Sequence, residues 1–130
     1  MNEKLTVLLL KFLKFGVVGA TGLVIDFAIT FLLKEKLKVN KYVSNSIGFI
    51  VAASSNYFFN RIWTFENTHP NISIQYFTFI VISLIGLFLS TTIVGLLHER
   101  MKLNFYWAKL IAIGVVMSWN FTANLFFTFK

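Results

Sequence analysis

The sequence of 130 residues contains no cysteine, one proline and two histidines. Without cysteine the chain forms neither a disulfide nor a thiolate metal site. His69 and His98 are too few to make a metal centre, so we expect no metal and no cofactor. No nucleophile and base stand at a recognisable spacing. We therefore do not expect an enzyme.

Charged side chains are also scarce. They make up 13% of the residues, whereas hydrophobic side chains make up 57%, and the mean hydropathy is +0.74. A water-soluble fold of this composition would have too few polar side chains to cover its surface. The formal net charge is +7, but the basic residues flank apolar runs instead of forming a basic soluble face. The composition predicts a membrane protein that binds no nucleic acid.

The apolar runs have the length of membrane spans. A hydrocarbon core of about 30 Å needs about 20 mostly apolar helical residues. Four segments qualify, and short polar connectors separate them: 15–33, 42–60, 74–97 and 106–129. We predict an all-α membrane protein with a single domain, 1–130, of four transmembrane helices. The first run lacks the small-residue cleavage site of a signal peptide.

The residues before the first span are basic and amphipathic. Lys4, Lys11 and Lys14 share one helical face, and apolar residues lie largely opposite. This pattern suits a separate N-terminal helix in the membrane interface. An ordinary basic flank of the first span explains the pattern equally well.

The chain also repeats itself. The stretch NYFFNRIWTF, from Asn56, is echoed by NFTANLFFTF, from Asn120. Each copy contains two spans, so we predict a duplicated helical hairpin whose copies run parallel. Asn56, Asn60, Asn120 and Asn124 lie on stripes of small and polar residues. Such stripes either pack helices together, with about 1 kcal/mol for each bridging amide, or face a polar substrate.

Comparison of the two copies isolates charges that occur only once. Three such charges are Asp26, which aligns with Ser90, Arg61, which aligns with Leu125, and Lys109, which aligns with Asn45. Asp26 lies about 16 Å into the first span. A carboxylate near mid-membrane costs about 2.5–3.5 kcal/mol to insert, which favours a functional role. The alternative role is a buried hydrogen-bonded or salt-bridged structural group.

The other two single charges lie near the membrane interfaces. Lys109 either pairs with Asp26 or extends its ammonium group to the interface. Arg61 lies at the opposite interface, where Trp63 and Phe65 follow as candidate anchors. A guanidinium grips phosphate through two parallel hydrogen bonds, although an interfacial arginine is more often only a positive flank.

Three segments carry a family resemblance: KFLKFGVVGATGLVIDFAITFLL, NSIGFIVAASSNYFFNRIWTFEN and WNFTANLFFTF. Together they resemble the GtrA-like family of small four-helix membrane proteins. The element NRIWTF at 60–65 is the most specific part, and Gly22 and Asp26 match the first-helix pattern. Leu125 departs from the arginine often seen in the second copy.

The resemblance implies a role in bacterial cell-surface polysaccharide or teichoic-acid glycosylation. Members are thought to flip a polyprenyl-phosphate-linked sugar, typically undecaprenyl-phosphate glucose, across the cytoplasmic membrane for membrane glycosyltransferases. It also implies cytoplasmic termini. The basic residues oppose that orientation, because five lie on the face with the termini and seven on the other.

The candidate substrate-binding residues are the polar groups of the stripes and the single charges: Asp26, Asn56, Asn60, Arg61, Lys109, Asn120 and Asn124. Four short helices enclose little volume, so we expect a homo-oligomer, at least a dimer. Two other functions fit the residues. One is a proton-coupled exporter of lipophilic cations, and the other is an accessory scaffold for a membrane glycosyltransferase.

Overall fold

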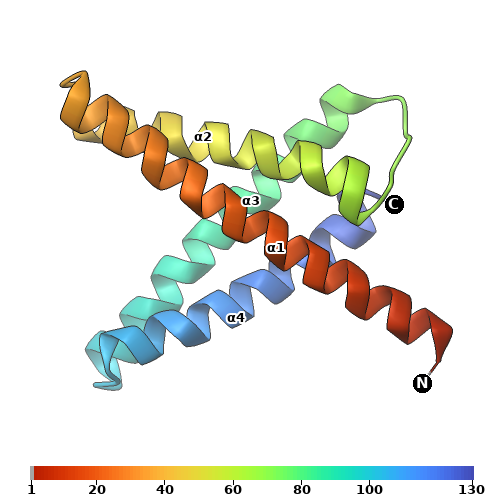
Figure 1. The fold of residues 1–130 in the computed structure, drawn as a ribbon. Coiled ribbons are helices and arrows are strands. Elements are labelled where there is room, and N and C mark those ends of the chain that lie inside the picture. The colour runs from red at the N-terminus through yellow and green to blue at the C-terminus, as the bar shows by residue number, and fades with distance from the viewer. Residues whose placement is uncertain (1) are drawn as a thin grey trace. The chain divides into compact units, whose positions relative to one another are not determined.

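The computed structural model describes residues 2–130, whose regular elements are all helical (Figure 1). There are four α-helices: α1 (Glu3–Phe31), α2 (Lys41–Phe59), α3 (Ile72–Gly95) and α4 (Phe105–Ala123). Each continues into a five-residue π-helical turn: Leu32–Lys36, Asn60–Thr64, Leu96–Arg100 and Asn124–Thr128. The connectors are therefore shorter than the sequence predicted.

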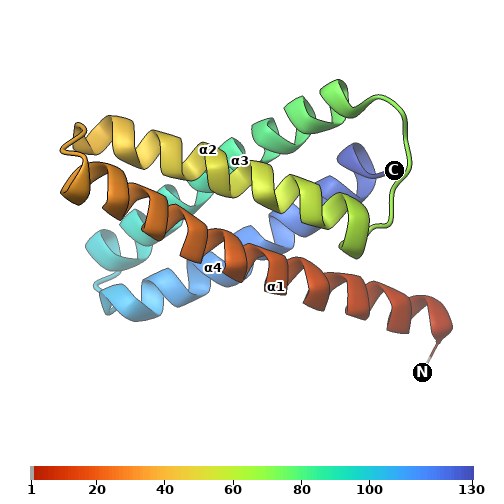
Figure 2. The same cartoon turned by 45° about the horizontal axis from the view of Figure 1, so that its top comes forward.

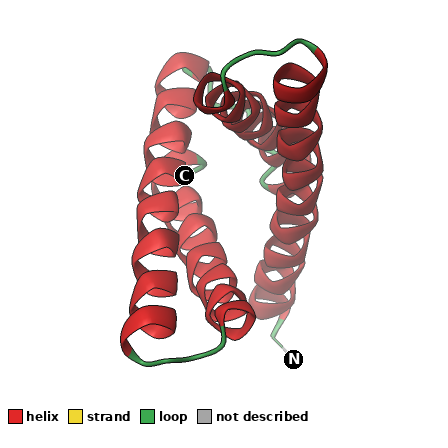
Figure 3. Cartoon of the chain, turned by 90° about the vertical axis from the view of Figure 1, so that its left-hand side faces the viewer, coloured by secondary structure: helices red, strands yellow, loops and turns green. Residues whose placement is uncertain are grey.

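The chain divides into two compact units, Met1–His69 and Pro70–Lys130. In unit 1, α1 and α2 run antiparallel and lie side by side (Figures 1 and 2). In unit 2, α3 and α4 form the corresponding hairpin. Only short loops join the helices (Figure 3). From the end of α1 onward, the element bounds of unit 2 follow those of unit 1 at an offset of 64 residues.

The same local signals shape the turn inside each hairpin. Lys38 in unit 1 and Lys102 in unit 2 have φ of 58° and 59°, the left-handed conformation that often ends a helix. Asn40 and Asn104 then cap the next helix, because each Oδ1 accepts from the backbone N–H two residues later at 2.8 Å. Each turn thus has both a stop signal and a start signal.

Matching aromatic pairs close the opposite end of each hairpin. The rings of Phe15 and Phe65 have centroids 6.3 Å apart in unit 1, and those of Phe79 and Phe129 are also 6.3 Å apart in unit 2. All four side chains are buried. Phe65, predicted as an interfacial anchor, therefore packs inside unit 1. Trp63 is exposed, as an interfacial anchor requires.

The predicted N-terminal interfacial helix is not a separate element. Helix α1 is continuous from Glu3 to Phe31, and no proline interrupts it. With its π-helical turn it spans 34 residues, which is about 51 Å and longer than a hydrocarbon core of about 30 Å. Its basic first turns are an extension of the span, as the basic-flank interpretation expects.

Three helical segments are long and apolar enough to cross a membrane: Glu3–Lys36, Ile72–Arg100 and Phe105–Thr128. The chain is therefore a membrane protein. The remaining predicted span, 42–60 on α2, is also helical. It is rich in serine and asparagine, so its composition is not apolar enough to identify it as a membrane span. Its buried face carries small side chains, among them Ser44, Gly48, Ala52 and Ala53, which allow α1 to approach closely.

Candidate functional site

A carboxylate lies at the contact between the two helices of unit 1. Asp26 is half-buried on α1, and its Oδ1 accepts a hydrogen bond from Thr30 Oγ1 at 3.2 Å. Gly48 of α2 lies against the same group, since a Cβ built there would be 2.7 Å from Asp26 Oδ1. A carboxylate has about four acceptor positions. Asp26 can therefore accept further donors.

Unit 2 has no carboxylate at this place. The counterparts of Asp26 and Gly48 are Ser90 and Ala112. Ala112 is fully buried, so unit 2 accommodates a methyl group at the position where unit 1 has no room for one. The larger side chain on the first helix and the glycine on the second therefore occur together, which the repeat comparison alone did not reveal.

Asn56 and Asn120 occupy equivalent positions and have equivalent surroundings. A Cβ built on Gly22 would lie 2.7 Å from Asn56 Nδ2, and one built on Gly86 would lie 2.7 Å from Asn120 Oδ1. Each amide thus packs over a glycine of the neighbouring helix. Among residues 2–130, no group donates a hydrogen bond to Asn56 Oδ1 or Asn120 Oδ1, although both atoms are buried.

Asn60 and Asn124 differ from that pair because their side-chain oxygens are satisfied. Asn60 Oδ1 accepts from Thr64 Oγ1, and Asn124 Oδ1 accepts from Thr128 Oγ1, both at 2.7 Å. Both asparagines are about 1% exposed. These bonds lie within the π-helical turns, so this pair stabilises the helix ends. The structure thereby separates four asparagines that the sequence pattern grouped together.

Arg61 holds the loop that leaves unit 1. Its Nη2 donates to the backbone carbonyl of His69 at 2.8 Å, and its own carbonyl accepts from the N–H of Asn67 at 2.8 Å. The side chain is half-buried. The structure thus gives Arg61 a structural contact in addition to its predicted phosphate role.

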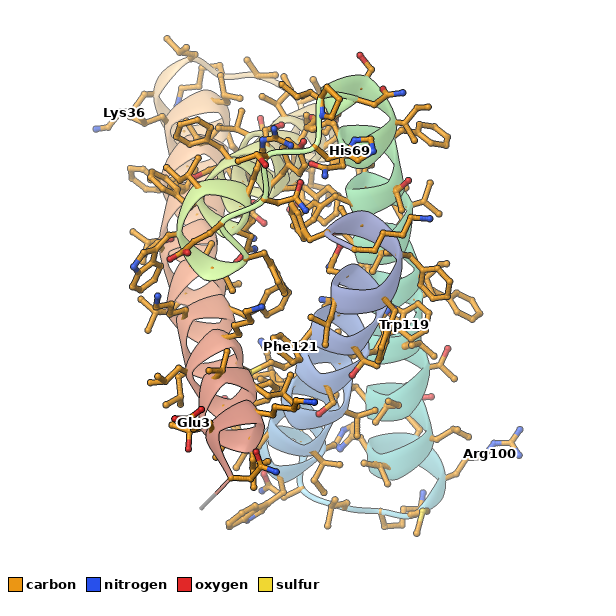
Figure 4. All side chains as sticks on the ribbon, turned by 90° about the vertical axis from the view of Figure 1, so that its right-hand side faces the viewer. Glu3, Lys36, His69, Arg100, Trp119 and Phe121 are labelled. Carbon is orange, nitrogen blue, oxygen red and sulfur yellow. The ribbon has the colours of Figure 1, made fainter. Side chains whose placement is uncertain are left out.

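Lys109 is exposed on α4, as expected for a side chain that extends to the interface. Trp119 of the same helix points toward α3 (Figure 4), where its Nε1 donates to the carbonyl of Ile82 at 3.2 Å. That bond ties the two helices of unit 2 together. Asn45, the counterpart of Lys109, is also exposed.

The sequence interpretation missed the contacts of two lysines on α1. Lys14 Nζ lies 5.2 Å from the ring centroid of Trp63, and Lys11 Nζ lies 6.0 Å from that of Phe65. Both distances allow a cation–π interaction. The comparison of copies contained the signal, because the counterparts of Lys11 and Lys14 are Gln75 and Thr78.

In the described part of the chain, no three His, Asp or Glu side chains lie close enough to hold a metal ion. The polar features are a membrane-depth carboxylate, two buried amide oxygens without a donor, and cations at one end of unit 1. A comparison with protein families matches residues 14–129 to the family described as GtrA/DPMS, transmembrane domain. No curated protein matches the chain.

Proposed function

Because the chain belongs to the GtrA/DPMS transmembrane domain family, we propose that it flips a polyprenyl-phosphate-linked sugar across the cytoplasmic membrane of a bacterium. The family is linked to the handling of sugar lipids in membranes, and the match confirms the resemblance found in the sequence. The proposed cargo is undecaprenyl-phosphate glucose or a similar lipid. Its sugar would serve the glycosylation of a surface polysaccharide or teichoic acid.

The observation that carries this proposal is the pair of buried amide oxygens without a donor, Asn56 Oδ1 and Asn120 Oδ1. A buried acceptor that lacks a donor costs about 1–3 kcal/mol, and hydrocarbon provides no water to satisfy it. The glycine beside each amide offers only Cα–H groups, which are weak donors. A sugar carries several hydroxyl donors, so these oxygens suit a transient polyhydroxylated ligand.

Each candidate residue then has a part. Asn56, Asn120 and Asp26 accept hydrogen bonds from sugar hydroxyls, whereas Asn60 and Asn124 keep the helix ends in shape. Arg61 binds the phosphate, and Lys109 attracts the anionic lipid at its interface.

The proposed topology has four crossings, because a helix that packs antiparallel along a membrane-spanning α1 crosses beside it. The segment Lys41–Thr64 is about 36 Å long, sufficient for a hydrocarbon core of about 30 Å. We propose that the two hairpins run parallel with both termini in the cytoplasm. We also propose a homo-oligomer, at least a dimer, that supplies a membrane glycosyltransferase.

The test uses purified protein in vesicles and measures the movement of a labelled polyprenyl-phosphate sugar between leaflets. Asn56→Leu and Asn120→Leu each remove an unsatisfied acceptor and keep the branched shape and the four heavy atoms of the side chain. We expect unchanged or higher stability and at least tenfold slower transport. Asn60→Leu is the matched control, because it breaks a satisfied hydrogen bond and lowers the stability of the fold.

Asp26→Asn keeps the size of the side chain and removes its charge, so we expect assembly to survive and transport to fall. Full transport by this variant and by both leucine variants would refute the proposed sugar contacts. The single carboxylate at membrane depth also favours a second function, a proton-coupled exporter of lipophilic cations. A cationic dye that moves through wild-type vesicles, while the sugar lipid does not, would favour the exporter. Movement of neither would favour the scaffold.

A further inference from the structure

A cavity lies at the end of unit 1 where α1 begins and α2 ends. Its volume is about 380 Å³, within the range of small-molecule sites. Residues of the N-terminal part of α1 and of the end of the π-helical turn after α2, with the two residues that follow it, line the cavity: Val7, Leu10, Lys11, Lys14, Thr64, Phe65 and Glu66. One wall is therefore basic and another is apolar.

The two ammonium groups in this cavity are held in place. Lys11 Nζ lies over the ring of Phe65, and Lys14 Nζ lies over the ring of Trp63. Phe65 is itself fixed, since it is buried and packs against Phe15. An ammonium group that is already positioned loses less conformational entropy when it binds an anion. The pair is therefore better prepared for a ligand than two lysines free in solvent.

The depth of the cavity matches that of lipid phosphates. The apolar run from Phe15 to Leu33 is about 28 Å long in a helix, nearly the thickness of the hydrocarbon core. Lys14 therefore lies at the hydrocarbon boundary, and Lys11 lies about 4.5 Å farther out. Headgroups occupy about the next 5–8 Å on each side.

The charge of the cavity suits a phosphodiester. Lys11 and Lys14 bring two positive charges, and the exposed Glu66 brings one negative charge. The net charge of these three side chains is therefore one positive charge, and a phosphodiester carries one negative charge. Unit 2 has Gln75 and Thr78 in place of the lysines, although its helix ends match those of unit 1. The hairpin fold does not require these cations.

We propose that this cavity docks the phosphate of a membrane lipid, with Lys11 and Lys14 as its ligands. The inference rests on the proposed function only for its first probe, a polyprenyl-phosphate sugar. A phosphodiester phospholipid has the same chemistry at the same depth. The dock adds to the site at Arg61, a residue that does not line the cavity.

The experiment measures equilibrium binding to the full chain in phosphatidylcholine nanodiscs, with a fluorescent polyprenyl-phosphate glucose as the probe. Lys11→Gln and Lys14→Thr introduce the residues of unit 2. We expect each to weaken binding about fivefold and the double variant about 25-fold, from the usual contribution of a basic residue at a lipid surface. Lys11→Arg with Lys14→Arg, which keeps both charges, should stay within about threefold of wild type.

Lys36→Gln is the matched control, because Lys36 lies at the opposite end of α1 from Glu3 (Figure 4) and its loss removes the same charge.

Competition with phosphatidylglycerol and with soluble glucose 1-phosphate identifies the source of the phosphate. Equal competition by phosphatidylglycerol supports the dock and assigns it to bulk phospholipid. Equal competition by glucose 1-phosphate overturns it, as does unchanged affinity in a correctly folded double variant.

These measurements need no transport, so they separate the dock from the proposed function. If the sugar is recognised at Asn56, then Asn56→Leu slows transport and leaves the phosphate contact at Lys11 and Lys14 in place. A failed transport assay with lysine-dependent binding would refute the flippase and keep the dock. Normal transport together with binding that does not depend on the lysines would refute the dock and keep the flippase.

Discussion

Gly48 is the position where one added methyl group has the sharpest expected effect. A Cβ there would meet Thr30 Oγ1, and it would lie 2.7 Å from Asp26 Oδ1 and 2.9 Å from the backbone carbonyl oxygen of Asp26. Side chains can rotate away, but a backbone atom moves only if the whole helix moves. An ordinary contact begins near 3.4 Å, so Gly48→Ala must separate α1 from α2 by about 0.5 Å at this point.

The size of the effect follows from two opposed terms. Overpacking a tight contact costs about 1–3 kcal/mol, whereas replacing glycine by alanine inside a helix gains about 0.5–1 kcal/mol. We therefore expect Gly48→Ala to lower the free energy of unfolding by about 1–2 kcal/mol. Gly19→Ala is the matched control, because no atom of a neighbouring element lies within 4 Å of its built Cβ. That variant should gain about 0.5–1 kcal/mol.

The measurement is unfolding of the purified protein in mixed detergent micelles, followed by circular dichroism. Unit 2 supplies a rescue, because Ala112 packs where Ser90 replaces the carboxylate and Val94 replaces Thr30. The triple variant Asp26→Ser, Thr30→Val, Gly48→Ala should regain the part of the lost stability that comes from the two side-chain contacts, whereas the contact with the backbone carbonyl oxygen of residue 26 remains. Non-additive free energies would reveal that coupling. A Gly48→Ala protein as stable as Gly19→Ala would refute the reasoning.

Two further predictions concern single positions. Arg61→Lys keeps a donor for the His69 carbonyl but loses the two parallel hydrogen bonds that a guanidinium makes to phosphate. Lipid binding in nanodiscs should therefore fall nearly as far as in Arg61→Ala, whereas proteolysis of the loop should rise only in the alanine variant. Wild-type lipid affinity in Arg61→Lys would refute the phosphate role of Arg61. Lys38 and Lys102 have a left-handed backbone conformation at a helix end, which glycine adopts without steric strain. Lys38→Gly and Lys102→Gly should therefore each raise the free energy of unfolding by about 1 kcal/mol. Lys36→Gly, within a π-helical turn, should lower it.

The fold was largely predictable because membrane spans and repeats leave strong sequence signals. The four apolar runs became the four helices, and the shift between Asn56 and Asn120 reappeared in the helix bounds. The extent of α1 was not predictable, because a basic amphipathic segment has the same pattern inside a long helix and in a separate one. Helix α2 is also hard to recognise as a membrane span from its composition, because its polar residues lower the mean hydropathy by which spans are identified.

The polar environment of the candidate residues was predictable from their types only in part. The pattern placed four asparagines on polar stripes, but whether an amide oxygen is satisfied depends on one threonine four residues later. Asn60 and Asn124 have that threonine, whereas Asn56 and Asn120 are followed there by another asparagine. The cavity at Lys11 and Lys14 depends on tertiary contacts with Phe65 and Trp63, which lie about fifty residues away along the chain.

The matching helix ends and differing charges of the two units have an evolutionary consequence. Positions such as Asn60 and Asn124, whose bonds are equal in both units, have little freedom to change, because the hairpin depends on them. Asp26 and Arg61 have apolar or neutral counterparts in a hairpin that folds without them. Selection can therefore alter these charges in one copy while the other preserves the scaffold. Related chains should vary at such asymmetric positions and far less at their helix ends.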